Sequence, residues 1–130
     1  YSAADGSAIA SIDANSSNNG FAMIAAGVSL AAGPWVRSGG ANQVITLLDT
    51  TFTLNTRTKS IGVYNGTTDY ASSLNGRTVL TAGAGTLPVG QTIIRLGAGG
   101  GFWNPLFGHI RRLSYWPTRM PNAFLMQVTS

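Results

Sequence analysis

Short β-prone runs separated by turn residues dominate this chain and limit the folds that it can adopt. Before the C-terminus, no apolar pattern of helical period persists over a window of about eleven residues. Runs rich in Val, Ile, Thr and aromatic residues recur instead between Gly, Asn and Asp clusters. The runs expected to form strands are residues 7–13, 21–30, 43–48, 51–56, 59–64, 70–74, 77–81, 92–97 and 109–116. The sequence therefore predicts an all-β protein.

Three Asn-Gly pairs mark expected reversals of the chain, because Gly adopts positive φ freely and Asn tolerates it. They are Asn19-Gly20, Asn65-Gly66 and Asn75-Gly76. The third pair lies between two short β-prone runs and predicts a hairpin of residues 70–74 with 77–81. A second expected strand pair, 43–48 with 51–56, surrounds Asp49-Thr50.

Segments rich in Gly, Pro, Ser or Asn are expected to be loops, at residues 14–19, 33–42, 83–90 and 98–105. Short strands with alternating apolar positions bury their faces naturally between two packed sheets. The 130 residues are sufficient for one such core. We therefore expect a single two-sheet antiparallel β-sandwich over residues 1–130. Because the chain begins at Tyr1, we expect it to be the C-terminal part of a longer protein.

Composition excludes several kinds of chemistry. The chain has no Cys and no Glu, four Asp and one His, so disulfides and thiolate zinc sites are impossible. Glycosidases need two closely placed carboxyl groups, and no paired acidic pattern occurs on any expected strand. His109, in an expected strand, is interpreted as structural. The sequence indicates no catalytic residue and no enzyme activity.

Charge and hydropathy favour neither nucleic acid nor a membrane as a partner. The net charge is +4, but the cations are scattered and only Arg111-Arg112 are adjacent. A nucleic-acid binder remains an alternative that steep salt dependence of DNA retention would reveal. The longest apolar stretch, residues 21–32, includes Gly27 and Ser29 and is shorter than the about 20 residues that a membrane helix needs.

The C-terminal third carries the most specific pattern. TIIRLG at residues 92–97 precedes a glycine-rich stretch, and GHIRRLSYWP at 108–117 is followed by RMPNAFLMQ at 119–127. Upstream, SLNG occupies residues 73–76. This pattern closely resembles the closing strands of the laminin-G/concanavalin A-like lectin-glucanase domains found at the C-terminus of bacteriophage and prophage tail or head fibre proteins. The resemblance covers roughly the last 60 residues of the chain and is weak before Lys59.

The resemblance implies a jelly-roll sandwich that closes with a short C-terminal helical turn. It also implies a non-catalytic fibre or spike domain of a phage or phage-like particle, exposed on the virion surface, which attaches to host-surface carbohydrate. The expected partners are host glycan, other virion subunits and further copies of the same chain, because avidity multiplies weak contacts. The alternatives are a purely structural virion decoration or assembly domain without a glycan ligand, and a secreted bacterial adhesin domain.

Aromatic residues beside polar loop residues are the candidate carbohydrate contacts, because a flat ring stacks on a sugar while amides and carboxylates bind its hydroxyl groups. The first choice is Trp103 with Asn104, at the end of a glycine-rich loop; the alternative is that Trp103 packs beneath its own loop. The further candidates are Trp35, Tyr64, Asn65, Asp69 and Tyr70.

Three open points concern metal, nucleotide and anion binding. Oxygen atoms of Asn65 and Asp69, supplemented by Asp13, leave calcium as an alternative, although one carboxylate makes a poor calcium site. No cofactor is expected, because the glycine run at 97–102 lacks the spacing and the following helix of a nucleotide loop. Arg111-Arg112 are interpreted as a solvated bulge that turns Ile110, Leu113 and Tyr115 inward; recognition of a polyanion or a sialic-acid-type sugar is the alternative.

The last expected element is a short helix at residues 121–128, with Leu125 and Val128 facing the core. Pro suits a first helical position. Compared with the family pattern, Pro121 and Phe124 replace the residues of a capping box, so we expect no side-chain cap. Phe124 and Met126 would point away from the core and form a subunit or fibre interface; simple surface apolarity is the alternative.

Overall fold

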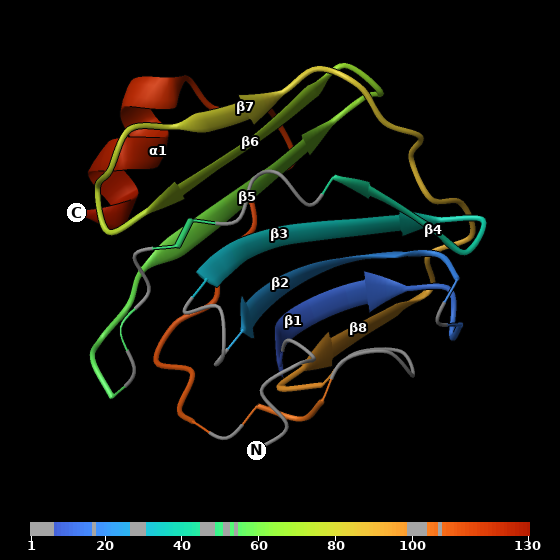
Figure 1. Cartoon of the computed structure of the whole chain (residues 1–130), viewed down its shortest axis with the longest axis horizontal. Helices are drawn as coiled ribbons and strands as arrows, with labels where there is room; N and C mark the ends of the chain where they lie inside the picture. The colour runs from blue at the N-terminus through green and yellow to red at the C-terminus, as the bar shows by residue number, and fades with distance from the viewer. Residues whose placement is uncertain are drawn as a thin grey trace.

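The computed structural model describes residues 7–16, 18–26, 31–44, 49–50, 53, 55–98, 104–106 and 108–130, and these form two antiparallel sheets and one helix (Figure 1). The five-stranded sheet has the order β4-β3-β2-β1-β8, and the three-stranded sheet has the order β5-β6-β7. The elements are β1 (Ser7–Asp13), β2 (Gly20–Ala26), β3 (Ala31–Ser38), β4 (Ala41–Val44), β5 (Ser60–Asn65), β6 (Asp69–Leu74), β7 (Leu80–Ala82), β8 (Ile93–Leu96) and α1 (Asn122–Thr129). The prediction of two antiparallel sheets with a short C-terminal helix is confirmed.

The two sheets meet through one face of β5 and β6. Tyr64 lies opposite Tyr70 in the β5–β6 register, and Tyr70 packs against Val36 of β3 in a buried cluster. The ring of Tyr64 lies 4.5 Å from that of Phe21 on β2, measured between centroids. At Gly62, an added Cβ would lie only 3.0 Å from Pro34 Cβ. The sheets therefore pack at close range where β5 faces β2 and β3.

Helix α1 covers the other face of the three-stranded sheet, as Figure 1 shows. Val63 and Ala71 are direct partners across β5 and β6, and both pack against Leu125. Successive residues of a strand point to opposite faces, so Tyr64 and Val63 serve the two different layers. The small sheet is thus covered on both sides, by the large sheet and by the helix.

The face that α1 buries differs by one position from the prediction. Leu125 is buried as expected, but Thr129 rather than Val128 is its buried partner one turn later. The Thr129 Oγ1 lies 3.1 Å from Ser73 Oγ and accepts a hydrogen bond from the Gly76 N–H at 3.0 Å. The expected absence of a side-chain cap is confirmed, since Pro121 at the N-cap forms no such hydrogen bond.

The Asn-Gly pairs behave differently from one another. Asn75 and Gly76, with φ of 48° and 73°, lie between β6 and β7, which confirms the hairpin, although its second strand is Leu80–Ala82 and not residues 77–81. Gly66 also has positive φ, at 67°, in the β5–β6 turn. In the first pair, however, Gly20 begins β2, and it is Asn15 of the preceding loop that has positive φ, at 54°. Each Asn-Gly pair therefore lies at a reversal of the chain, but the backbone conformation of the pair differs among the three turns.

The expected loop at residues 33–42 is instead most of the β3–β4 hairpin. Gly39 and Gly40, with φ of 57° and 82°, form its tight turn. Consequently β4 pairs with β3. The predicted pairing of residues 43–48 with 51–56 falls mostly on residues that the structure does not describe. Residues 45–48, 51, 52 and 54 lie outside the described part of the chain.

The predicted strand at residues 109–116 is wrong. The structure assigns no strand there, and no backbone hydrogen bond joins this segment to another described segment. Leu113 and Tyr115, expected to face inward, are 52% and 77% exposed. A β-prone sequence becomes a strand only where a neighbour completes its hydrogen bonds and covers one face. Within the described residues, neither sheet supplies that neighbour.

No helix among the described residues is both long and apolar enough to cross a bilayer.

The close approach at Gly62 predicts a stability effect. Gly62→Val would direct a side chain at Met23 Sδ, 2.6 Å from an added Cβ, and at Pro34 Cβ. We expect this overpacking to lower the free energy of unfolding by about 1–3 kcal/mol, measured by urea denaturation. Thr81→Val, at an exposed position of β7, is the control and should change it by less than about 0.5 kcal/mol. Equal stability of the two variants would contradict the close packing of the sheets.

Candidate functional site

The three Asp residues that the structure describes each form an ion pair with an arginine. The pairs are Asp13–Arg95 at 2.9 Å, Asp49–Arg77 at 3.2 Å and Asp69–Arg119 at 3.1 Å. The ion pairs differ in how far their carboxylates are exposed to solvent. The Asp13 side chain is 1% exposed, whereas that of Asp69 is 36% exposed. The first pair belongs to the interior, and the last is available to a ligand.

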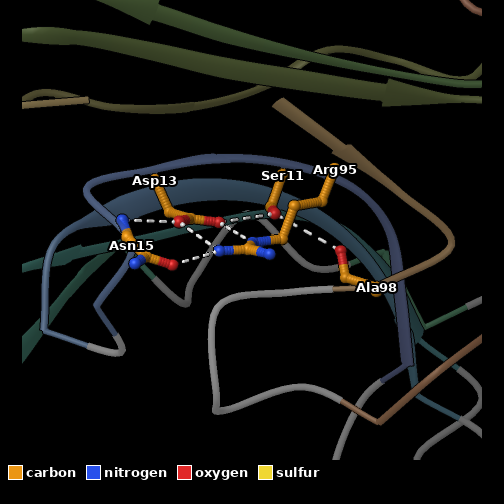
Figure 2. Close-up of polar contacts among 5 residues, drawn as sticks. All are labelled: Ser11, Asp13, Asn15, Arg95 and Ala98. Atoms are coloured by element: carbon orange, nitrogen blue, oxygen red, sulfur yellow. Dashed lines mark hydrogen bonds and ion pairs between the residues drawn. The ribbon is translucent and has the colours of Figure 1, made fainter. Parts of the chain in front are cut away.

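The buried pair connects the edge strand β8 to β1, as Figure 2 shows. Arg95 Nε donates to Asp13 Oδ2 at 2.9 Å, and Arg95 Nη2 donates to Asn15 Oδ1 at 2.7 Å. The Ser11 hydroxyl donates to Asp13 Oδ2 at 3.2 Å, and the Asn15 N–H donates to Oδ1 at 2.8 Å. Ser11, Asn15 and Arg95 together surround this carboxylate with donors, so the network stabilises the fold.

A second network lies at the surface, where the β5–β6 turn meets the start of α1. We define the Asp69 cluster as Asn65, Asp69, Arg119 and Asn122. Asn65 ends β5 and donates from Nδ2 to Asp69 Oδ2 at 3.0 Å. Arg119 donates from Nε to Asp69 Oδ2 at 3.1 Å and from Nη2 to Asn122 Oδ1 at 2.5 Å. Arg119 also donates to the Met120 carbonyl. Two strands and the helix therefore contribute to one polar surface.

Electrostatics keeps this cluster charged. The hydrogen bond from Asn65 and the Arg119 guanidinium together lower the pKa of Asp69, so its carboxylate is ionised at neutral pH. Asn65 and Asn122 are exposed, and the Arg119 side chain is 21% exposed. The cluster thus presents amide, carboxylate and guanidinium groups in fixed positions. This set can donate to and accept from the hydroxyl groups of a ligand.

The two tyrosines predicted as ligand contacts belong to the core. Tyr70 is 0% exposed, and it packs between the sheets instead of lying on a binding surface. Tyr64 is half-buried; its hydroxyl donates to the Ala22 carbonyl at 2.9 Å, and burial raises its pKa. Because Tyr64 and Tyr70 are cross-strand partners, both side chains lie on the same face of the sheet. Their role is to join the sheets beneath the turn that carries Asn65 and Asp69.

Trp35 lies on a strand and not in the predicted loop. It belongs to β3, is half-buried, and donates from Nε1 to Asn42 Oδ1 at 3.1 Å. Asn104 is half-buried, and its carbonyl accepts a hydrogen bond from the Ala8 N–H at 3.1 Å. Trp103 lies outside the described residues. Among the predicted carbohydrate contacts that the structure describes, Asn65 and Asp69 are the two that come together in a surface cluster.

Sequence reasoning missed Arg119 and Asn122 as site residues. Asp69 and Arg119 are 50 positions apart in the chain, so no local pattern connects them. The available signal was the place of Arg119 and Asn122 in the C-terminal motif RMPNAFLMQ at residues 119–127. The order of β5, the turn and β6 explains why Asn65 and Asp69 were found, since they are direct partners at the end of the hairpin.

The predicted interface residues have different surroundings. Phe124 is half-buried against the cluster of Val63, Ala71 and Leu125, and its ring meets Trp116 edge-on at 5.6 Å. It therefore contributes to attaching α1 to the sheet. Met126 is half-buried.

Within the described residues, no group of three or more His, Cys, Asp or Glu side chains gathers to hold a metal ion. The oxygens of Asp13 and Asp69, considered above for calcium, accept hydrogen bonds from arginine and from neighbouring N–H or O–H groups. We assign no metal site on these contacts.

Comparison of the chain with models of protein families, with curated proteins and with solved structures gives no significant match.

The buried ion pair predicts a large penalty when one partner is removed. Arg95→Met would leave the Asp13 carboxylate buried without its cation, and we expect the free energy of unfolding to fall by about 3–5 kcal/mol in urea denaturation. Arg77→Met is the matched control, because Arg77 is 56% exposed and its pair should contribute less than about 1 kcal/mol. Similar losses for both variants would contradict this assignment of roles.

The Asp69 carboxylate predicts a pH-dependent contribution to stability. Its pKa is lower in the folded state, so its contribution is present above the unfolded pKa of about 4 and is lost as the pH falls through the folded pKa. Asp69→Asn should therefore be less stable than the wild type by under about 1 kcal/mol near neutral pH. Unfolding measured at about pH 7 and about pH 2 should show this difference shrinking in acid. A difference that is equal at both pH values would exclude this role.

Proposed function

We propose that this chain is a non-catalytic attachment domain of a phage or phage-like fibre or spike, and that it binds carbohydrate on the host surface. In this proposal the two sheets are the core of a jelly-roll sandwich of the laminin-G/concanavalin A-like kind. The observation that carries the proposed ligand is the Asp69 cluster, in which an exposed amide, a carboxylate and a guanidinium are held together at the surface. The C-terminal sequence resemblance supports the particle assignment.

The chemistry of the Asp69 cluster suits sugar hydroxyl groups, which donate and accept at the same time. Asp69 accepts hydrogen bonds, Arg119 donates them, and the amides of Asn65 and Asn122 do both. Their mutual contacts hold these groups in place before a ligand arrives, which reduces the entropy lost on binding. Specificity in such sites comes from a small number of well-placed polar groups. The cluster thus supplies the polar half of a carbohydrate site.

The arrangement of the carboxylates favours carbohydrate binding over hydrolysis of a glycosidic bond. A glycosidase uses two carboxyl groups about 5–9.5 Å apart, one of which must carry a proton. Asp13, Asp49 and Asp69 each form an ion pair with an arginine. At Asp69, the hydrogen bond from Asn65 and the Arg119 guanidinium lower the pKa of the carboxyl group. The chain also contains no Glu. The described carboxylates therefore support binding and not acid catalysis.

A structural virion domain without a glycan ligand is the second candidate. The observation that favours it is the apolar surface of β8, where Ile94 is 69% exposed and Leu96 is 59% exposed. The two residues are two positions apart and lie on the same face of this edge strand. Such a face suits contact with another virion subunit or a further copy of this chain.

Adsorption to host cells distinguishes the two candidates. We expect Asn65→Ala/Asn122→Ala to adsorb about tenfold more weakly than the wild type, because sugar hydroxyl groups lose hydrogen-bond partners. Thr78→Ala/Thr92→Ala, which removes two exposed polar side chains elsewhere, should adsorb as the wild type does. Binding to a glycan array provides the direct measurement with the same proteins.

Unchanged adsorption by the asparagine double variant would contradict the carbohydrate proposal and favour the structural one, provided that its melting temperature equals that of the wild type.

A further inference from the structure

We propose that the exposed segment from His109 to Tyr115, called here the 109–115 segment, binds carboxylate groups of an acidic polysaccharide next to the Asp69 cluster. This inference rests on the proposed carbohydrate function and names the class of glycan. Its basis is the combination of free positive charge, an exposed aromatic ring and proximity along the chain to Arg119.

Charge pairing leaves the arginines of this segment available. Arg77, Arg95 and Arg119 are paired with Asp49, Asp13 and Asp69. Arg111 and Arg112 are exposed and form no ion pair with any described residue. The Nε of Arg112 donates only to the neutral Ser114 hydroxyl, at 3.2 Å. Two adjacent guanidiniums thus face solvent without a counter-charge from the described chain.

The segment also presents an aromatic surface. Tyr115 is 77% exposed and Leu113 is 52% exposed, although buried positions were expected for both. A tyrosine ring can stack on the apolar face of a sugar while its hydroxyl forms hydrogen bonds. Guanidiniums bind carboxylates through two parallel hydrogen bonds, which gives geometry as well as charge. Together these groups match the chemistry of an acidic sugar.

The 109–115 segment runs directly into the Asp69 cluster. Arg119 is four residues beyond Tyr115, so their Cα atoms are at most about 14 Å apart. Between them, Trp116 packs edge-on against Phe124 of α1 and anchors the end of the segment to the helix. One extended polysaccharide can therefore contact both surfaces, with its hydroxyl groups at the cluster and its carboxylates at the arginines.

Nucleic acid fits this segment less well than an acidic glycan does. Duplex DNA binders commonly contact about 6–10 phosphates. The segment contains two cationic side chains, Arg111 and Arg112. This supply of charge suits a polymer that carries one carboxylate per sugar unit and offers hydroxyl groups to the neighbouring cluster.

The test compares alginate, a polyuronate, with neutral dextran of similar length. The wild type should bind alginate more tightly than dextran, and added salt should weaken the alginate complex. Arg111→Ala/Arg112→Ala should weaken alginate binding about tenfold or more and leave dextran binding unchanged. Arg57→Ala/Lys59→Ala is the matched control: it removes the same charge outside the segment and should retain alginate binding.

Three results would overturn the inference. Equal losses in both double variants would show that net charge, and not this segment, attracts the polymer. Duplex DNA bound more tightly than alginate, with the same dependence on Arg111 and Arg112, would assign the segment to nucleic acid. Equal binding of alginate and dextran by the wild type would remove the acidic-glycan claim. In that last case, carbohydrate binding that depends on Asn65 and Asn122 would stand, which separates this inference from the proposed function.

Discussion

Alternation of side chains along β5 and β6 is the constraint on which the arrangement of the layers depends. Tyr64 and Tyr70 point to the large sheet, and Val63 and Ala71 point to α1. A shift of one residue in this register would exchange the two faces and place tyrosines beneath the helix. The turn that ends this hairpin carries Asn65 and Asp69. The same register therefore determines which side chains are buried and places the residues of the candidate site at the surface.

Local sequence patterns predicted the elements whose neighbours lie close in the chain. The run at residues 70–74 and its Asn75-Gly76 turn formed the expected hairpin, because positive φ at two consecutive residues suits few other structures. The stretch from residue 31 to 44 was predicted mainly as a loop, but it forms the β3–β4 hairpin. The Gly39-Gly40 turn was interpreted as part of a long loop. Gly33 and Pro34 also suggested a loop, but they belong to β3, which lies between β2 and β4 and accepts small, buried residues.

Tertiary context decided the rest. Residues 109–116 have strong β propensity, but the described sheets offer them no partner, so propensity alone failed. Tyr70 was a candidate ligand contact because it follows the polar turn that contains Gly66 and Asp69, yet the pairing with β5 buries it. In the candidate site, Asn65 and Asp69 were predictable from the hairpin. Arg119 was not, because only packing of α1 on the small sheet brings it to Asp69.

The attachment of β8 to β1 determines when this fold can be completed. Asp13 and Arg95 are separated by 82 positions, and the two strands are neighbours in the five-stranded sheet. Closing so long a loop costs conformational entropy before any contact compensates for it. During synthesis, β1 can pair with β2 early. The opposite edge of β1 can pair only after β8 has left the ribosome. Until then the Asp13 carboxylate lacks its arginine partner and β1 is itself an unpaired edge of the sheet, which exposes the nascent chain to aggregation before β8 arrives.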